Sequence, residues 1–131
     1  MAFPINKKSG KWRCVCDYAL TNKQIQPDSY PLPLMEEIVA EQAKCELFTT
    51  VDLRDAFHQV ALDPASRPIT NVQMPSGLWQ WAVVPQGINN GPPLLQRDID
   101  STCKAAEDKA RPYFDDIIIC SQREARMSDA E

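Results

Sequence analysis

The sequence predicts an α+β fold, and three observations lead to that class. Segments 33–44 and 93–108 carry apolar residues at the spacing of one helix face. Segments 69–74 and 78–84 are rich in β-forming residues and flank the sequence Pro-Ser-Gly, which is typical of a β-hairpin. The apolar run 47–53, with Thr and Val at its centre, predicts a buried strand. The pattern therefore indicates β-strands with helices packed against them.

The elements of the first third follow in chain order. Residues 11–16 alternate in polarity as a strand does, and the sequence Lys-Ser-Gly-Lys at 8–11 predicts a hairpin turn before it. Prolines punctuate residues 22–33, which predicts an extended connection. Pro33 suits the first turn of helix 33–44, because the N–H that proline lacks has no helical partner there. This helix leads directly into the predicted buried strand.

The later elements alternate between strand, loop and helix. Residues 57–62 predict a second strand, which the turn-forming sequence 63–68 ends. After the hairpin, residues 85–93 are rich in Gly, Asn and Pro and predict a loop. Helix 93–108 follows, and the polar tail 122–131 predicts the start of a further helix.

Composition excludes several classes of protein. Hydrophobic residues make up 44% and charged residues 24% of the chain, as in ordinary soluble domains. No apolar run reaches the roughly 18 residues of a membrane span, and the first ten residues lack the apolar core of a secretion signal. We therefore expect no membrane association and an intracellular location.

Charge is unevenly distributed along the chain. The net charge of −4 excludes a uniformly basic nucleic-acid binder. Residues 1–23 are nevertheless basic and residues 28–55 acidic. This asymmetry fits a site that grips phosphates at one end and metal at the other, and an ordinary solvated surface explains it equally well.

The cysteine pattern argues against a disulfide framework. The chain has five cysteines, an odd number, without any Cys-x-x-Cys pair, and its one histidine is His58. This pattern also argues against a zinc site. We expect scattered buried thiols and a reducing compartment, and we assign no chemistry to His58.

Two adjacent acids, Asp115 and Asp116, precede the apolar run 117–120. Because consecutive strand residues point to opposite faces, these acids share a ligand only if the chain turns at Phe114 and Asp115. Asp52 ends the strand 47–53, so neighbouring strands would bring three carboxylates to one end of a sheet. Two Mg²⁺ ions would relieve the repulsion between them and suit phosphoryl transfer. The alternative is an exposed turn with two acids that bind nothing.

Four motifs occur in one order with close spacing: "KKSGKWR", "FTTVDLRDAFHQVAL", "VVPQGINNGPPLLQR" and "YFDDIIICS". Together they resemble the reverse transcriptase domain of long-terminal-repeat retrotransposons and retroviruses, in particular that of gypsy-type elements. The resemblance extends over about residues 5–125.

The resemblance implies the palm of a right-hand polymerase, with an antiparallel sheet and packed helices, partial fingers and no thumb. About residues 1–30 would be fingers-like and about residues 31–125 palm-like, with helices 33–44 and 93–108 on one face of the sheet. The implied partners are an RNA or DNA template–primer, deoxynucleoside triphosphates, and the thumb and ribonuclease H domains of a longer polyprotein. The implied location is the cytoplasm or an element particle.

The resemblance also implies the chemistry. Asp52, Asp115 and Asp116 would be catalytic acids that bind two Mg²⁺ ions, with Mn²⁺ as a substitute, while a primer 3′-hydroxyl attacks the α-phosphate of a deoxynucleotide. The residues expected to contact that nucleotide are Lys7, Lys8 and Arg13 at the triphosphate, Asp55 and Ala56 beside it, Phe57 as the gate against a ribose 2′-hydroxyl, and Gln86. The alternatives are a solvated turn for the basic residues, core packing for Phe57 and a loop cap for Gln86.

The sequence departs from the family pattern at several positions. Lys109, Arg111 and Pro112 stand where the family has apolar residues, so we expect a weak first strand in the catalytic hairpin. Ala19 replaces an expected arginine, and Gly91 replaces a small alanine or serine. These departures leave two function classes open: an RNA-directed DNA polymerase core, or a non-catalytic remnant that folds or binds nucleic acid or a partner. A fragment that does not fold stably alone is a third possibility.

Overall fold

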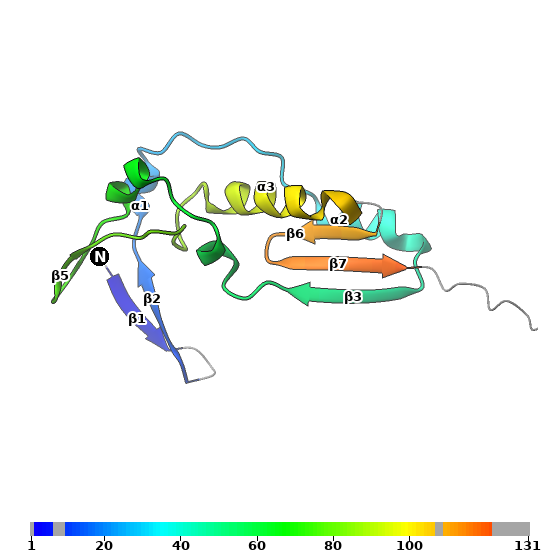
Figure 1. The fold of residues 1–131 in the computed structure, drawn as a ribbon, viewed down its shortest axis with the longest axis horizontal. Coiled ribbons are helices and arrows are strands. Elements are labelled where there is room, and N and C mark those ends of the chain that lie inside the picture. Colours follow the sequence, from blue (N-terminus) through cyan, green and yellow to red (C-terminus); the bar gives the residue numbers. More distant parts are fainter. Residues whose placement is uncertain (1, 7–9, 107–108, 122–131) are drawn as a thin grey trace, which may run out of the picture.

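The computed structural model describes residues 2–6, 10–106 and 109–121. A three-stranded sheet with a long helix beside it forms one end of the molecule, and short β-hairpins form the other end (Figure 1). Helices and antiparallel strands alternate along the chain, so the predicted α+β class is confirmed. Among the residues just given, no helix is long and apolar enough to cross a membrane.

The three-stranded sheet contains β3 (Leu47–Asp52), β7 (Asp116–Ser121) and β6 (Ala110–Tyr113), in the order β3-β7-β6. Both pairs of neighbours are antiparallel. The apolar run of β7 occupies the centre of the sheet, where it has a strand on each side. A tight turn at residues 114–115 joins β6 to β7, as the sequence predicts.

The first strand of this hairpin forms in spite of its polar sequence. β6 lies at the edge of the sheet, where a residue without an N–H is tolerated, and Pro112 pairs there with Ile117. The Arg111 guanidinium donates to a carboxylate oxygen of Glu41 at 2.6 Å. The strand is therefore present, and at the edge of the sheet, where Pro112 costs less than in the central position that the expectation assumed.

Both predicted helices are present. Helix 33–44 appears as α2 (Met35–Glu41) followed by the 3₁₀ turn η1 (Gln42–Lys44). Helix 93–108 appears as α3 (Gly91–Cys103) followed by the 3₁₀ turn η4 (Lys104–Ala106).

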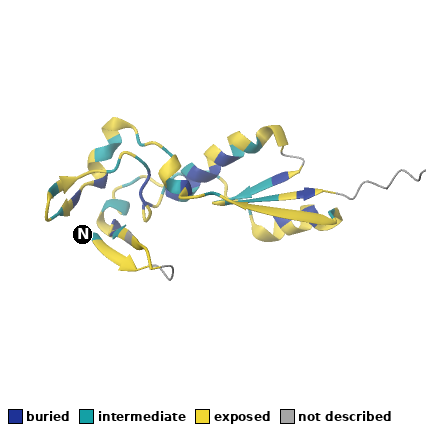
Figure 2. Ribbon diagram, turned by 60° about the horizontal axis from the view of Figure 1, so that its bottom comes forward, coloured by how far each residue is buried: buried dark blue, intermediate teal, exposed yellow. Residues whose placement is uncertain are grey.

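The two helices cover opposite faces of the sheet, not one face as expected. Leu95 and Ile99 of α3 form a core cluster with Ala56, and Ile117 of β7 packs against this cluster. Glu41 of α2 instead pairs with Arg111, which lies opposite Ile118. Since Ile117 and Ile118 point to opposite faces, α3 and α2 lie on different sides, as Figure 2 shows.

The other end of the molecule is built from two hairpins. β1 (Ala2–Asn6) pairs with β2 (Trp12–Cys16), and β4 (Val72–Met74) pairs with β5 (Gly77–Trp79). The short helix α1 (Ala19–Asn22) follows β2. A second core cluster, made of Cys16, Tyr18, Val72 and Ile88, joins the hairpins. The predicted strand 11–16 and the later hairpin are confirmed, although the hairpin strands are shorter than predicted.

The extended connection after α1 is tied to α3. The Arg97 guanidinium donates to both carboxylate oxygens of Asp28, at 2.8 and 2.9 Å. The Tyr30 hydroxyl donates to Asp100 at 2.6 Å, and this bond raises the pKa of the phenol. These contacts anchor the linker along the helix that supports the sheet.

One sequence prediction is wrong in this region. Residues 57–62 are not a strand: the 3₁₀ turn η2 (Ala56–Gln59) follows Asp55, whose backbone is left-handed, and Ala61 alone among them forms a β-bridge, to Val83. The turn-forming sequence 63–68 lies in the 3₁₀ helix η3 (Pro64–Thr70), whose start is capped by Asp63.

The predicted strand 47–53 is present as β3, but the prediction that it is buried is wrong. All six of its residues are exposed, because β3 is an edge strand and nothing within the described residues covers it (Figure 2). The helix expected from residue 122 onward lies outside the described residues.

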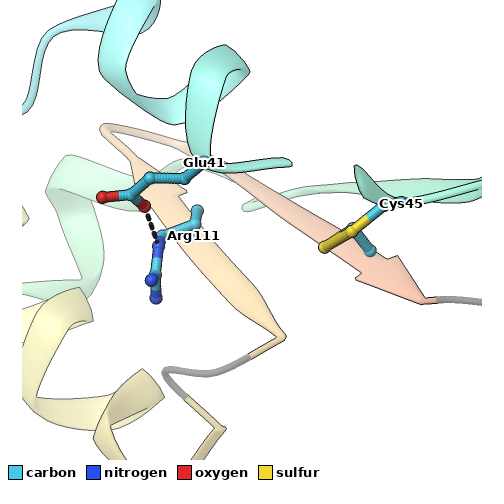
Figure 3. Close-up of a disulfide and its surroundings, with 4 residues drawn as sticks. Glu41, Cys45 and Arg111 are labelled. Carbon is cyan, nitrogen blue, oxygen red and sulfur yellow. Dashed lines mark hydrogen bonds and ion pairs between the residues drawn. A yellow bond between two sulfur atoms is a disulfide. The ribbon is translucent and has the colours of Figure 1, made fainter. Parts of the chain in front are cut away.

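The cysteine expectation also needs correction. Cys45 and Cys120 form a disulfide with their Cα atoms 5.7 Å apart (Figure 3). It links the segment before β3 to the end of β7, beside the Glu41–Arg111 pair. Cys14, Cys16 and Cys103 are free thiols. Sequence reasoning missed the bond because its partners are 75 residues apart and share no motif.

Candidate functional site

The three acids meet at one end of the three-stranded sheet. Asp52, the last residue of β3, lies directly opposite Asp116, the first residue of β7. Side chains of directly opposed residues share a face. The Leu53 N–H donates to the carbonyl of Asp115 at 2.7 Å, which ties the turn to the end of β3. Strand register therefore brings the backbones of the three acids to one end of the sheet, because the strands are neighbours as the sequence prediction required.

The turn that carries Asp115 has a strained backbone. Phe114 adopts φ +54°, in the left-handed region that non-glycine residues rarely enter. Such a conformation persists where surrounding contacts determine it, and it occurs often at functional sites. Asp115 is exposed and Asp116 half-buried, so the turn presents its carboxylates toward solvent.

The three side chains suit Mg²⁺ in chemistry, because all are carboxylates, and their backbones lie at the same end of the sheet. Across the described part of the chain, however, no group of three or more His, Cys, Asp and Glu side chains is close enough to hold a metal ion. Binding would therefore require side-chain rotations of these acids on a backbone that already places them together.

Gln96 of α3 holds the turn from behind, and sequence reasoning missed it. Its side-chain oxygen accepts from the Phe114 N–H at 2.9 Å. Its amide nitrogen donates to the Pro112 carbonyl at 3.1 Å and to Asp100 at 2.9 Å. Only 1% of Gln96 is exposed. The available signal was a glutamine between Leu95 and Ile99 on the apolar face of the helix.

The residues expected at the nucleotide follow β3 directly. Asp55 is exposed, and its backbone lies in the left-handed region with φ +49°. It directly precedes η2. Ala56 is buried against α3, whereas Phe57 is half-buried. The Phe57 ring packs close to Gly91, where an added Cβ would lie 3.2 Å from its Cε1 atom. Gly91 therefore makes room for this ring.

Gln86 lies between two cavities. One, of about 190 Å³, is lined by Gln86 together with Asp55, His58 and Trp81, and by residues of β2. The other, of about 450 Å³, is lined by Gln86, Phe57 and the loop 87–89 with Pro92. Asp55 and Phe57 thus each share a cavity with Gln86, which comes from a later segment of the chain.

The basic residues are placed only in part. Arg13 lies in β2 opposite Ile5 of β1, whereas Lys7 and Lys8 fall outside the described residues. Cys14 of the same strand borders the smaller cavity. Burial, with a contribution from Cys16, raises the pKa of the Cys14 thiol, so this thiol stays protonated and is a poor nucleophile.

Comparison with known proteins gives consistent similarities. A family model described as reverse transcriptase (RNA-dependent DNA polymerase) matches residues 5–130. The chain is 38% identical over 114 residues to a retrovirus-related Pol polyprotein from transposon 297 of Drosophila melanogaster, covering 86% of this chain and 11% of that protein. It is 35% identical over 127 residues to the enzymatic polyprotein of cauliflower mosaic virus (strain Strasbourg), covering 94% and 19%.

A solved structure shares the fold. The foamy viral protease–reverse transcriptase in complex with double-stranded DNA superposes with a TM-score of 0.83 at 26% identity. The match covers 93% of this chain and 21% of that one. The chain thus spans about a fifth or less of the length of the proteins it matches.

Proposed function

The chain belongs to the reverse transcriptase family, whose members are RNA-directed DNA polymerases, and on that premise we propose that it is the catalytic core of a retroelement polymerase. About residues 31–125 act as the palm and about residues 1–30 as part of the fingers. The reaction is the attack of a primer 3′-hydroxyl on the α-phosphate of a deoxynucleoside triphosphate, with pyrophosphate as the leaving group. Its element is of the gypsy type.

Asp52, Asp115 and Asp116 hold two Mg²⁺ ions in this proposal, or Mn²⁺ as a substitute. Bound ions of this kind neutralise charge that develops on the attacking and leaving oxygens. The protein fixes the acids through strand register and through the Leu53–Asp115 hydrogen bond. The buried Gln96 also fixes the acids, because its side chain accepts a hydrogen bond from Phe114 in the turn. Such fixing matters because small displacements of catalytic groups lower the rate strongly.

The nucleotide occupies the region around Gln86, with its triphosphate toward Asp55 and Ala56. Lys7, Lys8 and Arg13 supply positive charge to the phosphates, for which a guanidinium fork and a compact ammonium are suited. Phe57 blocks a ribose 2′-hydroxyl and thereby selects deoxynucleotides. The two cavities that share Gln86 support this placement.

The partners of this core are an RNA or DNA template–primer and deoxynucleotides, together with the thumb and ribonuclease H domains of a longer polyprotein. We place the protein in the cytoplasm or in an element particle. The much greater length of the relatives supports the proposal of a polyprotein.

The observation that carries the proposal is the opposition of Asp52 and Asp116 with Asp115 tied beside them. Primer extension on a primed RNA homopolymer, with Mg²⁺ and separately with Mn²⁺, tests it. Changing Asp115→Asn and Asp116→Asn together should lower extension at least about 100-fold, a loss typical of removing transition-state charge stabilisation. Asp98→Asn, at an exposed acid of α3, is the matched control and should retain extension.

Two outcomes would contradict polymerase activity: extension that survives in the double variant, or no extension from folded wild-type protein. The second would favour a non-catalytic remnant that binds nucleic acid or a partner. Binding of a labelled primer–template without extension would identify it.

A further inference from the structure

The imidazole ring of His58 stacks on the indole of Trp81. Their ring centroids are 5.3 Å apart and their planes are inclined by 21°. This separation falls in the range of about 4.5–7 Å at which aromatic pairs attract one another. His58 is otherwise exposed, and the role proposed above makes no use of it.

The stack joins η2 to the segment that begins at Trp81, and backbone hydrogen bonds between residues 60–62 and 82–84 also connect these segments. His58 belongs to η2, which Ala56 anchors in the core cluster of α3. The backbone N–H of His58 donates to the Asp55 carbonyl at 2.8 Å, so His58 and Asp55 belong to one closed turn. Trp81 packs instead against the cluster of the hairpins, and its backbone N–H donates to the Thr70 hydroxyl at 3.0 Å.

The same two rings line the cavity of about 190 Å³ between Asp55 and Gln86. Asp55 directly precedes η2, and Gln86 follows five residues after Trp81. A shift of Trp81 relative to η2 would therefore change the width of this cavity. The titratable side chains that border it with His58 are Asp55, from the same turn, and Cys14 and Cys16, from β2.

We propose that His58 is a positioning residue for nucleotide binding, which acts by stacking on Trp81 and so sets the spacing of Asp55 and Gln86 across this cavity. The ligand class is a deoxynucleoside triphosphate, so the inference rests on the proposed function and deepens it. The ring, and not a proton on it, performs this role.

The test compares His58→Ala, which removes the ring, with His58→Phe, which keeps an aromatic ring but no N–H group. Binding of dTTP is measured with Mg²⁺ on a primed RNA template whose primer ends in a dideoxynucleotide, so that the nucleotide binds without reacting. His58→Ala should raise the dissociation constant about threefold to tenfold, as expected for loss of an aromatic pair. His58→Phe should stay within about twofold of wild type.

Primer extension supplies a second readout. In His58→Ala the KM for dTTP should rise while kcat changes little, because the interaction contributes equally to ground-state and transition-state binding. A loss of folded protein would instead lower kcat alone. Trp79→Ala is the matched control, since Trp79 is an exposed tryptophan nearby that does not line this cavity.

Either of two results overturns the inference: a dissociation constant for His58→Ala within twofold of wild type, or equal defects in His58→Ala and His58→Phe. The proposed function fails separately. Nucleotide binding that depends on the ring without any extension would reject catalysis and keep this role. Extension that depends on Asp115 and Asp116 but not on His58 would support catalysis and reject the role of His58.

Discussion

The contact between Gly91 and Phe57 illustrates how one missing methyl group shapes the site. A Cβ at position 91 would lie 3.2 Å from Cε1 of Phe57 and 3.6 Å from Cγ1 of Val84. Val84 is fully buried and cannot yield, whereas Phe57 is half-buried and borders the cavity beside Gln86. An added methyl group would therefore displace the Phe57 ring toward that cavity.

Gly91→Ala should consequently sharpen the selection of deoxynucleotides by roughly tenfold or less, because less than one methylene of space is removed beside the sugar. The measurement is the ratio of kcat/KM for dCTP to that for CTP. Ser101→Ala, on the exposed side of α3, is the control and should leave the ratio unchanged. An unchanged or smaller ratio in Gly91→Ala would show that Phe57 does not act as the gate.

At the scale of elements, the hairpin of β6 and β7 depends on α3 as much as on its own strands. β6 is short, lies at an edge and contains Pro112. Gln96 supplies what this strand lacks, because it binds the backbone of Pro112 within β6 and of Phe114 at the start of the turn. Leu95 and Ile99 hold the glutamine in place by packing into the core on either side of it.

Gln96→Leu should lower the free energy of unfolding by about 1–3 kcal/mol, because it leaves the partly buried Phe114 N–H and Pro112 carbonyl without their side-chain partner. Urea unfolding measures this change. Gln73→Leu, at an exposed glutamine of β4, should change stability by less than about 0.5 kcal/mol and serves as the control. Equal effects of the two substitutions would show that the Gln96 hydrogen bonds to residues 112 and 114 do not stabilise the hairpin.

Gln96→Glu adds a pH dependence with a definite sign. The new carboxyl group would be buried beside Asp100 and the Pro112 carbonyl, both of which raise its pKa in the folded state. The folded state would then bind the proton more tightly than the unfolded state does. Relative to wild type, stability should be greatest at acid pH and should fall as pH rises above the ordinary glutamate value of about 4.3. Urea unfolding at several pH values checks this, and a constant difference would contradict it.

At the scale of the whole molecule, the core is small and divided. Its two clusters lie in different parts, and large apolar side chains such as Phe48 and Trp12 are more than half exposed. Long-range ties therefore carry much of the stability. The Cys45–Cys120 disulfide is one of them, and it holds the sheet at the end opposite the three acids (Figure 3).

Reduction of this bond should lower the free energy of unfolding by about 4 kcal/mol. The bond closes a loop between residues 75 positions apart, and without it the unfolded chain gains conformational entropy. Guanidinium unfolding with and without a reductant measures the loss, and the pair Cys45→Ser and Cys120→Ser should reproduce it. Cys103→Ser, which removes a free thiol, is the control and should not reproduce this loss of stability. Thiol titration of the unfolded, unreduced chain should find three reactive groups; five would refute the disulfide.

Local features of the chain were predicted well because their causes are local. Turn residues and periodicity placed the hairpin turn at Phe114 and Asp115, the later hairpin and both long helices within a few residues. The error at 57–62 has a local cause too, since an apolar alternating segment looks like a strand unless the left-handed turn at Asp55 is known.

The sequence by itself determined the α+β class, the family and the candidate acids, because these depend on residue type and order along the chain. Tertiary structure alone decided which residues meet: Asp52 opposite Asp116, Gln96 behind the turn, His58 on Trp81, and Cys45 with Cys120. It also decided that β3 is exposed and that α2 and α3 cover opposite faces. The physical reason is that strand register and helix packing are set by the summed burial and hydrogen bonding of distant segments, which no local pattern records.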